Sequence, residues 1–145
     1  MNVIHFRRST IEDFPEIIEF VSESKLPVSD IIPGKQLFTV AEAKNKIIGS
    51  AGLEVYGNNG LFRSLAVKPN YRNLKIGKDL LTKTINLCKD GSIKRLYLLT
   101  TTADIYFLKL GWKVIERNDV PEDIRLSSEF LSICPSTAVC MIYQL

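Results

Sequence analysis

The sequence has few of the residues that build metal centres or disulfide frameworks. Its 145 residues include one histidine, His5, and three widely separated cysteines, Cys88, Cys134 and Cys140. An odd number of distant cysteines argues against a disulfide framework and favours a reduced, cytoplasmic setting. A lone histidine without a close cysteine pair argues against a zinc site. We therefore expect no metal centre, and we expect Cys134 and Cys140 to be buried, because cysteine is among the most buried residue types.

Long apolar runs and long basic runs are also missing. No apolar stretch approaches the ~18 residues that cross a bilayer, and the N-terminus lacks the charged-then-apolar order of a signal peptide. The net charge is +3, but no five or six basic residues stand together, so we expect neither a membrane nor a nucleic-acid partner. What is present is ordinary for one globular domain over residues 1–145, with 46% hydrophobic and 24% charged residues.

Hydrophobic periodicity and turn residues divide the chain into strands and helices. Polar turns are expected at Asn45–Lys46 and Gly57–Gly60, and a loop or broken helix at Leu26–Lys35. The pattern predicts one α/β (α+β) domain with a mixed, mostly antiparallel sheet flanked by helices. The expected strands are Val3–Arg8, Phe38–Lys44, Ile47–Tyr56, Leu61–Val67, Arg95–Thr101, Trp112–Glu116 and Ala138–Tyr143. The expected helices are Ile11–Glu23, Gly77–Lys89, Ala103–Leu110 and a short one that begins near Asp119.

The most informative stretch is Leu61–Leu81. An apolar strand runs into Pro69, a polar turn and Gly77, and then an amphipathic helix begins. A loop of free backbone N–H groups that opens a helix is suited to hold an anion, and Arg72, Lys75 and Lys78 add positive charge there. The pattern predicts a ligand that carries phosphates.

The segment Arg72-Asn-Leu-Lys75-Ile-Gly77 resembles the Arg/Gln-x-x-Gly-x-Gly/Ala signature of the GNAT superfamily of acetyl-CoA-dependent N-acetyltransferases. Ser64–Pro69 before it and Tyr106–Trp112 after it resemble the family in the same order. The chain departs from the signature at Lys75, which replaces the first glycine. A side chain is tolerated there if the backbone does not need a positive φ.

A narrower resemblance is to the branch of this superfamily that is associated with arsenic-resistance operons, close to the acetyltransferase domain of N-acetylglutamate synthases. It is carried by Leu53-Glu54, Arg63–Val67, Leu99–Ala103 and the tail Phe130–Ala138. The resemblance implies the GNAT-like acyl-CoA N-acyltransferase fold, acetyl-CoA as co-substrate, and a small amine as acceptor, such as an amino acid.

The resemblance also implies which residues hold the cofactor. The amides from Leu74 to Lys78 would cradle the pyrophosphate, and the main chain of the preceding strand would meet the pantetheine arm and the thioester carbonyl. A strand edge left open by splaying offers unpaired donors and acceptors for that purpose. The expected cofactor residues are Leu65, Ala66, Val67, Arg72, Asn73, Leu74, Lys75, Ile76, Gly77 and Lys78.

The catalytic and acceptor residues each have a structural alternative. Glu54 is the only acid of the central hairpin strand and is either the general base or a solvated carboxylate. The family's acid is often a tyrosine where this chain has Phe107, so Phe107 is expected to pack and Tyr106, one residue earlier, is the candidate acid. Arg63 either clamps a substrate carboxylate or forms a surface ion pair. The remaining candidates are Thr100, Thr101 and Thr102, which either line the acceptor pocket or are ordinary strand residues.

Three functions remain open at this point. The first is direct transfer to a small amine, since no cysteine lies in the motif strand or the following loop to act as nucleophile. The others are a cofactor-binding sensor and a protein-modifying acetyltransferase. A homodimer could form if the last strand, Ala138–Tyr143, pairs between subunits.

Overall fold

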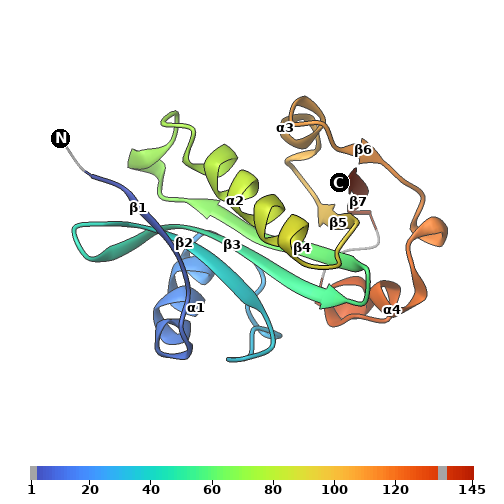
Figure 1. The fold of residues 1–145 in the computed structure, drawn as a ribbon, viewed down its shortest axis with the longest axis horizontal. Coiled ribbons are helices and arrows are strands. Elements are labelled where there is room, and N and C mark those ends of the chain that lie inside the picture. The colour runs from blue at the N-terminus through green and yellow to red at the C-terminus, as the bar shows by residue number, and fades with distance from the viewer. Residues whose placement is uncertain (1–2, 134–136) are drawn as a thin grey trace.

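A computed structural model describes residues 3–133 and 137–145, so Cys134 lies outside the described residues. In the described part, seven strands form one sheet in the order β1-β2-β3-β4-β5-β7-β6 (Figure 1). Neighbouring strands are antiparallel except β4 and β5, which are parallel. The predicted mixed, mostly antiparallel sheet is confirmed. The strands are β1 (His5–Arg8), β2 (Leu37–Ala43), β3 (Lys46–Tyr56), β4 (Asn59–Val67), β5 (Arg95–Thr100), β6 (Lys113–Val114) and β7 (Val139–Gln144).

The helices lie on both faces of the sheet. They are α1 (Phe14–Glu23), α2 (Ile76–Asp90), α3 (Asp104–Lys109) and α4 (Glu122–Arg125), with shorter helical turns at Ile11–Asp13, Pro69–Tyr71, Arg117–Asp119 and Glu129–Ile133. In β2, Val40 packs in the cluster that includes α1, whereas the next residue, Ala41, packs in the cluster that includes α2. Successive strand side chains point to opposite faces, so α1 and α2 cover opposite sides of the sheet.

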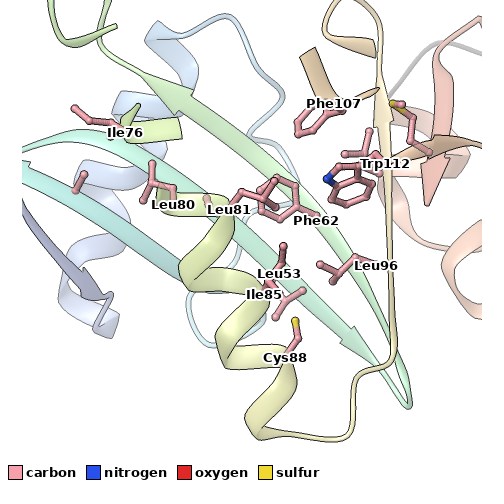
Figure 2. Packing of buried hydrophobic residues seen from close by; sticks show 14 of the residues in the cluster. Leu53, Phe62, Ile76, Leu80, Leu81, Ile85, Cys88, Leu96, Phe107 and Trp112 are labelled. Carbon is pink, nitrogen blue, oxygen red and sulfur yellow. The ribbon is translucent and has the colours of Figure 1, made fainter. Parts of the chain in front are cut away.

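Helix α2 buries the face that its sequence predicts. Leu80, Leu81, Ile85 and Cys88 point toward side chains of the sheet such as Leu53, Phe62 and Leu96 (Figure 2). Thr84, on the same face, is buried and donates its hydroxyl to the Leu80 carbonyl. Burial raises the pKa of the Cys88 thiol to about 11, so this cysteine is a neutral core residue, and Cys140 is buried as expected.

Several element ends differ from the sequence prediction. The first hairpin turns at Lys44 and Asn45, one residue before the predicted turn. Both residues have a positive φ, as a two-residue hairpin turn of the I′ type requires. The second turn is confined to Gly57 and Asn58. Helix α3 ends as expected at Gly111, whose φ of +98° lets the amides of Gly111 and Trp112 reach the carbonyls of Leu108 and Phe107.

A bulge in β4 and a divergence of β4 from β5 open the sheet at one end. Ser50 pairs with Ala66 and Gly52 with Arg63, so Ser64 and Leu65 together oppose a single residue of β3. Ser64 has a φ of +56°, which is how a bulge turns a strand. Strands β4 and β5 pair only from Asn59–Arg95 to Leu61–Tyr97. Beyond Leu61 the edge of β4 is therefore open toward β5.

The last strand is not an edge strand in this fold. Strand β7 pairs with β5 along its whole length and with β6 at Met141 and Ile142. A homodimer through this strand would have to displace β6, so the sequence-based route to a dimer is not favoured by the topology. No helix in the described part of the chain is long and apolar enough to cross a membrane.

Candidate functional site

A cleft of about 860 Å³ occupies the wedge between β4 and β5. Its walls come from residues 62–67 of β4, residues 98–103 at the end of β5, the start of α2, α3, and residues 24–27 after α1. Nine of the ten predicted cofactor residues line it, and Leu74 alone points elsewhere, with 59% of its surface exposed. The open edge of β4 thus faces a cavity large enough for a small-molecule ligand.

The start of α2 presents free amides to this cleft. The first hydrogen bond of the helix runs from the Asp79 amide to the Lys75 carbonyl. The amides of Ile76, Gly77 and Lys78 precede it, and within the described residues no protein group accepts from them. Such unpaired amides and the helix dipole together favour an anion. Arg72 stands beside them, with its Nε 3.2 Å from the Val67 carbonyl oxygen.

Lys75 corrects one expectation from the sequence. A side chain was expected to be tolerated at this position if the backbone does not need a positive φ, but the φ of Lys75 is +61°, in the left-handed region. For a residue with a Cβ this conformation costs roughly 1–2 kcal/mol relative to the right-handed form. A glycine, as in the family signature, would avoid that cost, so Lys75 is a strained residue at the mouth of the anion site.

The Tyr106 hydroxyl lies at the start of α2. A Cβ built on Gly77 would be 2.9 Å from the Tyr106 hydroxyl oxygen. The side chain therefore reaches from α3 across the cleft to the amide-rich turn. Burial raises the pKa of Tyr106, so its hydroxyl remains a hydrogen-bond donor at neutral pH. Phe107 is buried against Phe62 and Trp112, which confirms it as a packing residue (Figure 2).

A buried ionic cluster lies at the Arg63 side of the cleft. Arg63 donates from Nη2 to Asp30 Oδ1 at 2.7 Å, from Nη1 to Asp30 Oδ2 at 2.5 Å, and from Nη1 to Glu54 Oε2 at 3.0 Å. The side chains of Arg63, Asp30 and Glu54 are 1%, 7% and 4% exposed. The solvated carboxylate and the surface ion pair offered as alternatives for Glu54 and Arg63 are therefore both wrong, because both side chains are buried.

The pKa values in this cluster follow from its contacts. Burial raises the pKa of Asp30, but the hydrogen bonds and the charge of Arg63 outweigh it, so that the pKa is lowered overall. For Arg63, burial lowers the pKa, while its hydrogen bonds to Asp30 and the charges of Glu129, Asp30 and Glu54 raise it above its usual value. Asp30 and Arg63 are therefore a charged pair at neutral pH.

Glu54 is enclosed by donors and does not line the cleft. Its Oε1 accepts from the Tyr56 hydroxyl at 2.6 Å, and its Oε2 accepts from Gln36 Nε2 at 2.9 Å as well as from Arg63. Burial and the Glu54 carboxylate raise the pKa of Tyr56. Gln36 also donates to the Asp30 carbonyl and accepts from the Ile32 amide. The cluster thus ties the loop after α1 to the sheet.

The remaining predicted acceptor residues divide into two groups. Thr100 accepts a hydrogen bond from the Ala103 amide through Oγ1 at 2.9 Å, so its side chain helps to begin α3. Thr101 and Thr102 are exposed and line the cleft. The sequence did not identify Asp30 or Glu129 as site residues. Glu129 is buried and lines the cleft. Neither lies in a motif or a periodic segment, so only its folded position identifies it.

Comparison with known families decides the class of this site. Residues 34–114, more than half of the chain, match the acetyltransferase (GNAT) domain family. The chain belongs to the GNAT acetyltransferase family. It is 29% identical over 117 residues to an uncharacterised N-acetyltransferase of Chlorobaculum tepidum, covering 80% of this chain and 73% of that protein. It is also 33% identical over 86 residues to the amino-acid acetyltransferase of Aeromonas salmonicida.

That second match covers 58% of this chain but only 20% of the Aeromonas protein, so this GNAT chain spans about a fifth of its amino-acid acetyltransferase relative. Among solved structures, the N-acetylglutamate synthase of Neisseria gonorrhoeae, in complex with coenzyme A and N-acetyl-glutamate, matches with a TM-score of 0.83 at 19% identity. The match covers 99% of this chain and 35% of that one. A GNAT acetyltransferase of Staphylococcus aureus matches over 99% of both chains with a TM-score of 0.79 at 24% identity. These likenesses establish the fold.

Proposed function

We propose that this protein is an acetyl-CoA-dependent N-acetyltransferase that acts on a small-molecule amine by direct attack. One observation carries the proposal. The open edge of β4 and the unpaired amides at the start of α2 border the same cleft. An anion site that continues into an open strand edge suits a ligand with a phosphate group at one end and an amide-bearing arm at the other.

The residues of the cleft fit such a cofactor. The amides of Ile76, Gly77 and Lys78 would hold the pyrophosphate, with Arg72 and Lys78 supplying positive charge. The main chain of Leu65–Val67 would pair with the pantetheine arm, and an amide there would polarise the thioester carbonyl as charge develops on its oxygen. The Tyr106 hydroxyl, placed beside Gly77, would donate a hydrogen bond to the cofactor near the phosphates.

The reaction requires little proton transfer from the protein if the acceptor is an α-amine. The nitrogen lone pair attacks the thioester carbon, the C–S bond breaks, the ammonium proton leaves to a base or to water, and the thiolate departs. An α-amine with a pKa of about 7.7–8.0 is about a tenth neutral at pH 7, and a thiol of pKa about 8.5 is a fair leaving group. Glu54 lies behind Arg63 and does not line the cleft. It would therefore accept the proton through water rather than by direct contact with the amine.

The acceptor is proposed to be an amino acid or a related small amine. The amino-acid acetyltransferase relatives support this class. The resemblance to the arsenic-resistance-associated branch stays a prediction, and the dimer does too. Arsenical amines therefore belong in any acceptor screen.

A turnover assay with a panel of free amines separates this function from the two alternatives. Release of free thiol from acetyl-CoA would be followed with amino acids, diamines, arsenical amines and a lysine-containing peptide. Turnover with free amines supports the proposal. Binding of acetyl-CoA without turnover would indicate a sensor, and turnover with the peptide alone would indicate a protein-modifying enzyme.

The Glu54→Gln variant tests the proton route. Glutamine has nearly the same shape as glutamate but no charge. Its amide oxygen can still accept from Arg63 and Gln36, while its NH2 group takes the place of the oxygen that accepts from Tyr56. We expect slower turnover with unchanged acetyl-CoA binding. Unchanged turnover would remove Glu54 from the mechanism. The matched control Glu12→Gln, at an exposed residue that does not line the cleft, should change neither turnover nor acetyl-CoA binding.

A further inference from the structure

A buried side chain of β3 is hydrogen-bonded to the bulge in β4. Ser50, which is 0% exposed, donates its hydroxyl to the Ser64 carbonyl oxygen at 2.7 Å. The acceptor is a main-chain group of the bulge, where Ser64 and Leu65 together oppose one residue of β3. This side-chain hydrogen bond therefore acts at the place where the register of the two strands shifts.

The backbone of Ser64 is strained and needs support. Its φ of +56° lies in the left-handed region, which is costly for a residue that has a Cβ. A strained backbone of this kind persists only where the surrounding structure holds it, and such residues are concentrated at functional sites. The Ser64 hydroxyl oxygen accepts from Arg63 Nε at 3.3 Å, a longer contact than the one from Ser50. The hydroxyl of Ser50 is thus the closer of the two side-chain donors to Ser64.

The planarity of the peptide bond converts this contact into an orientation of the next amide. In a trans peptide the carbonyl and the following N–H point in opposite directions. The Ser64 carbonyl accepts from Ser50 of β3, so the Leu65 N–H points away from Ser50, toward the edge of β4 that is unpaired beyond Leu61. Leu65 lines the cleft at that edge.

We propose that Ser50 is a positioning residue, whose hydroxyl holds the Ser64–Leu65 peptide so that the Leu65 amide polarises the thioester carbonyl of acetyl-CoA. The inference rests on the proposed function and adds to it the side chain that orients the amide. Ser50 does not line the cleft, so it acts through the peptide and contacts neither substrate. A preoriented donor stabilises the charge that develops on the oxygen in the transition state, so its loss lowers kcat more than it weakens binding.

The first experiment measures the C=O stretching frequency of bound acetyl-CoA, labelled with ¹³C at the thioester carbonyl, by infrared spectroscopy without an acceptor amine. A hydrogen bond from the Leu65 amide lowers this frequency. We expect a lower frequency for bound than for free acetyl-CoA in the wild type, and a frequency closer to the free value in Ser50→Ala. Equal frequencies for free and wild-type-bound acetyl-CoA would overturn the inference without the need for a variant.

Steady-state kinetics give the second readout. Removal of an oxyanion donor lowers kcat by about 10²–10³, so misorientation of that donor in Ser50→Ala should lower kcat at least about tenfold. The KM for the amine and the acetyl-CoA dissociation constant should stay near their wild-type values. The matched control is Thr84→Val, which removes another buried hydroxyl that donates to a backbone carbonyl, at 2.9 Å, but lies outside the cleft. This control should keep the wild-type kcat and carbonyl frequency.

The outcomes are distinct. Ser50→Cys, which keeps a side chain of similar size with a weaker donor, is the second variant if Ser50→Ala does not fold. A variant of Ser50 that is folded by circular dichroism and keeps the wild-type kcat and carbonyl frequency overturns the inference but leaves the acetyltransferase function intact. An equal fall of kcat in Thr84→Val also overturns it, because the fall then follows any lost buried hydroxyl. Absence of wild-type turnover with every amine would overturn the proposed function, and this inference with it.

Discussion

Arg63 is the one buried cation of the described structure, and its removal should be among the most damaging substitutions in the chain. In Arg63→Met, Asp30 and Glu54 lose the donor they share, although their side chains remain only 7% and 4% exposed. Breaking a buried ion pair by removing one partner costs about 3–5 kcal/mol. Single domains are stable by only about 5–15 kcal/mol, so this one substitution removes a large fraction of the total.

Trp112 provides the assay, because it is the single tryptophan and is 1% exposed. Its fluorescence would follow unfolding in urea. With a slope of roughly 2 kcal/mol per molar urea, the midpoint of Arg63→Met should fall by about 2 M. The control is Arg8→Met on β1, whose side chain is exposed, and its free energy of unfolding should change by less than about 0.5 kcal/mol.

The pH dependence separates a charge effect from lost packing. The native pKa of Asp30 is lowered, so its stabilising contribution is present above its unfolded pKa of about 3.9 and is lost as the pH falls below that. In Arg63→Met the hydrogen bonds and charge of Arg63 no longer oppose the effect of burial, which raises the pKa of Asp30. The loss of stability relative to the wild type should therefore be largest at pH 7 and smaller at pH 4.5. A loss below 1 kcal/mol, or one that is equal at both pH values, would refute the reasoning.

Three further predictions concern the phosphate end of the cleft. Acetyl-CoA at a hundred times its dissociation constant should stabilise the wild type by about 2.7 kcal/mol. Gly77→Asp should abolish that thermal shift by placing a carboxylate among the amides at the start of α2. The control Gly91→Asp, whose Cβ would have only ordinary contacts, should keep the shift. A full shift in Gly77→Asp would contradict phosphate binding by these amides. Lys75→Gly should raise the unfolding free energy of the unliganded protein by about 0.5–1 kcal/mol, because relief of the left-handed strain exceeds the entropy cost of glycine. Equal stability of Lys75→Gly and Lys75→Ala would count against strain at this position. Tyr106→Phe should raise the acetyl-CoA dissociation constant roughly tenfold through loss of a hydrogen bond to a charged group, with kcat nearly unchanged. A hundredfold fall in kcat at unchanged affinity would instead make Tyr106 the general acid.

The parts of the fold that follow from local pattern were predictable. The buried face of α2 and the glycine that ends α3 are set by residues a few positions apart, so the periodicity and the turn residues indicate them directly. The left-handed backbone of Lys75 was not predictable, because lysine gives no local sign of a positive φ. The short length of β6 was missed as well, since pairing with β7 at two positions, rather than the pattern of Trp112–Glu116, decides it.

The acceptor end of the site depends on distant contacts. Asp30 and Arg63 are 33 residues apart in sequence, and Asp30 lies in a segment with no helical or strand pattern. Glu54 and Arg63 were both identified as functional candidates, but their pairing requires the register of β3 and β4. The amide-rich turn, in contrast, lies within one continuous motif, and its sequence alone was sufficient to predict an anion site.

The central claim is that the main-chain amides at the start of α2 bind the pyrophosphate of the cofactor. An amide-resolved NMR titration of the ¹⁵N-labelled protein with coenzyme A measures this directly. The account predicts that the largest shift changes fall on the amides of Ile76, Gly77 and Lys78, with smaller changes along Leu65–Val67. Saturable binding that leaves these amides unperturbed would contradict it.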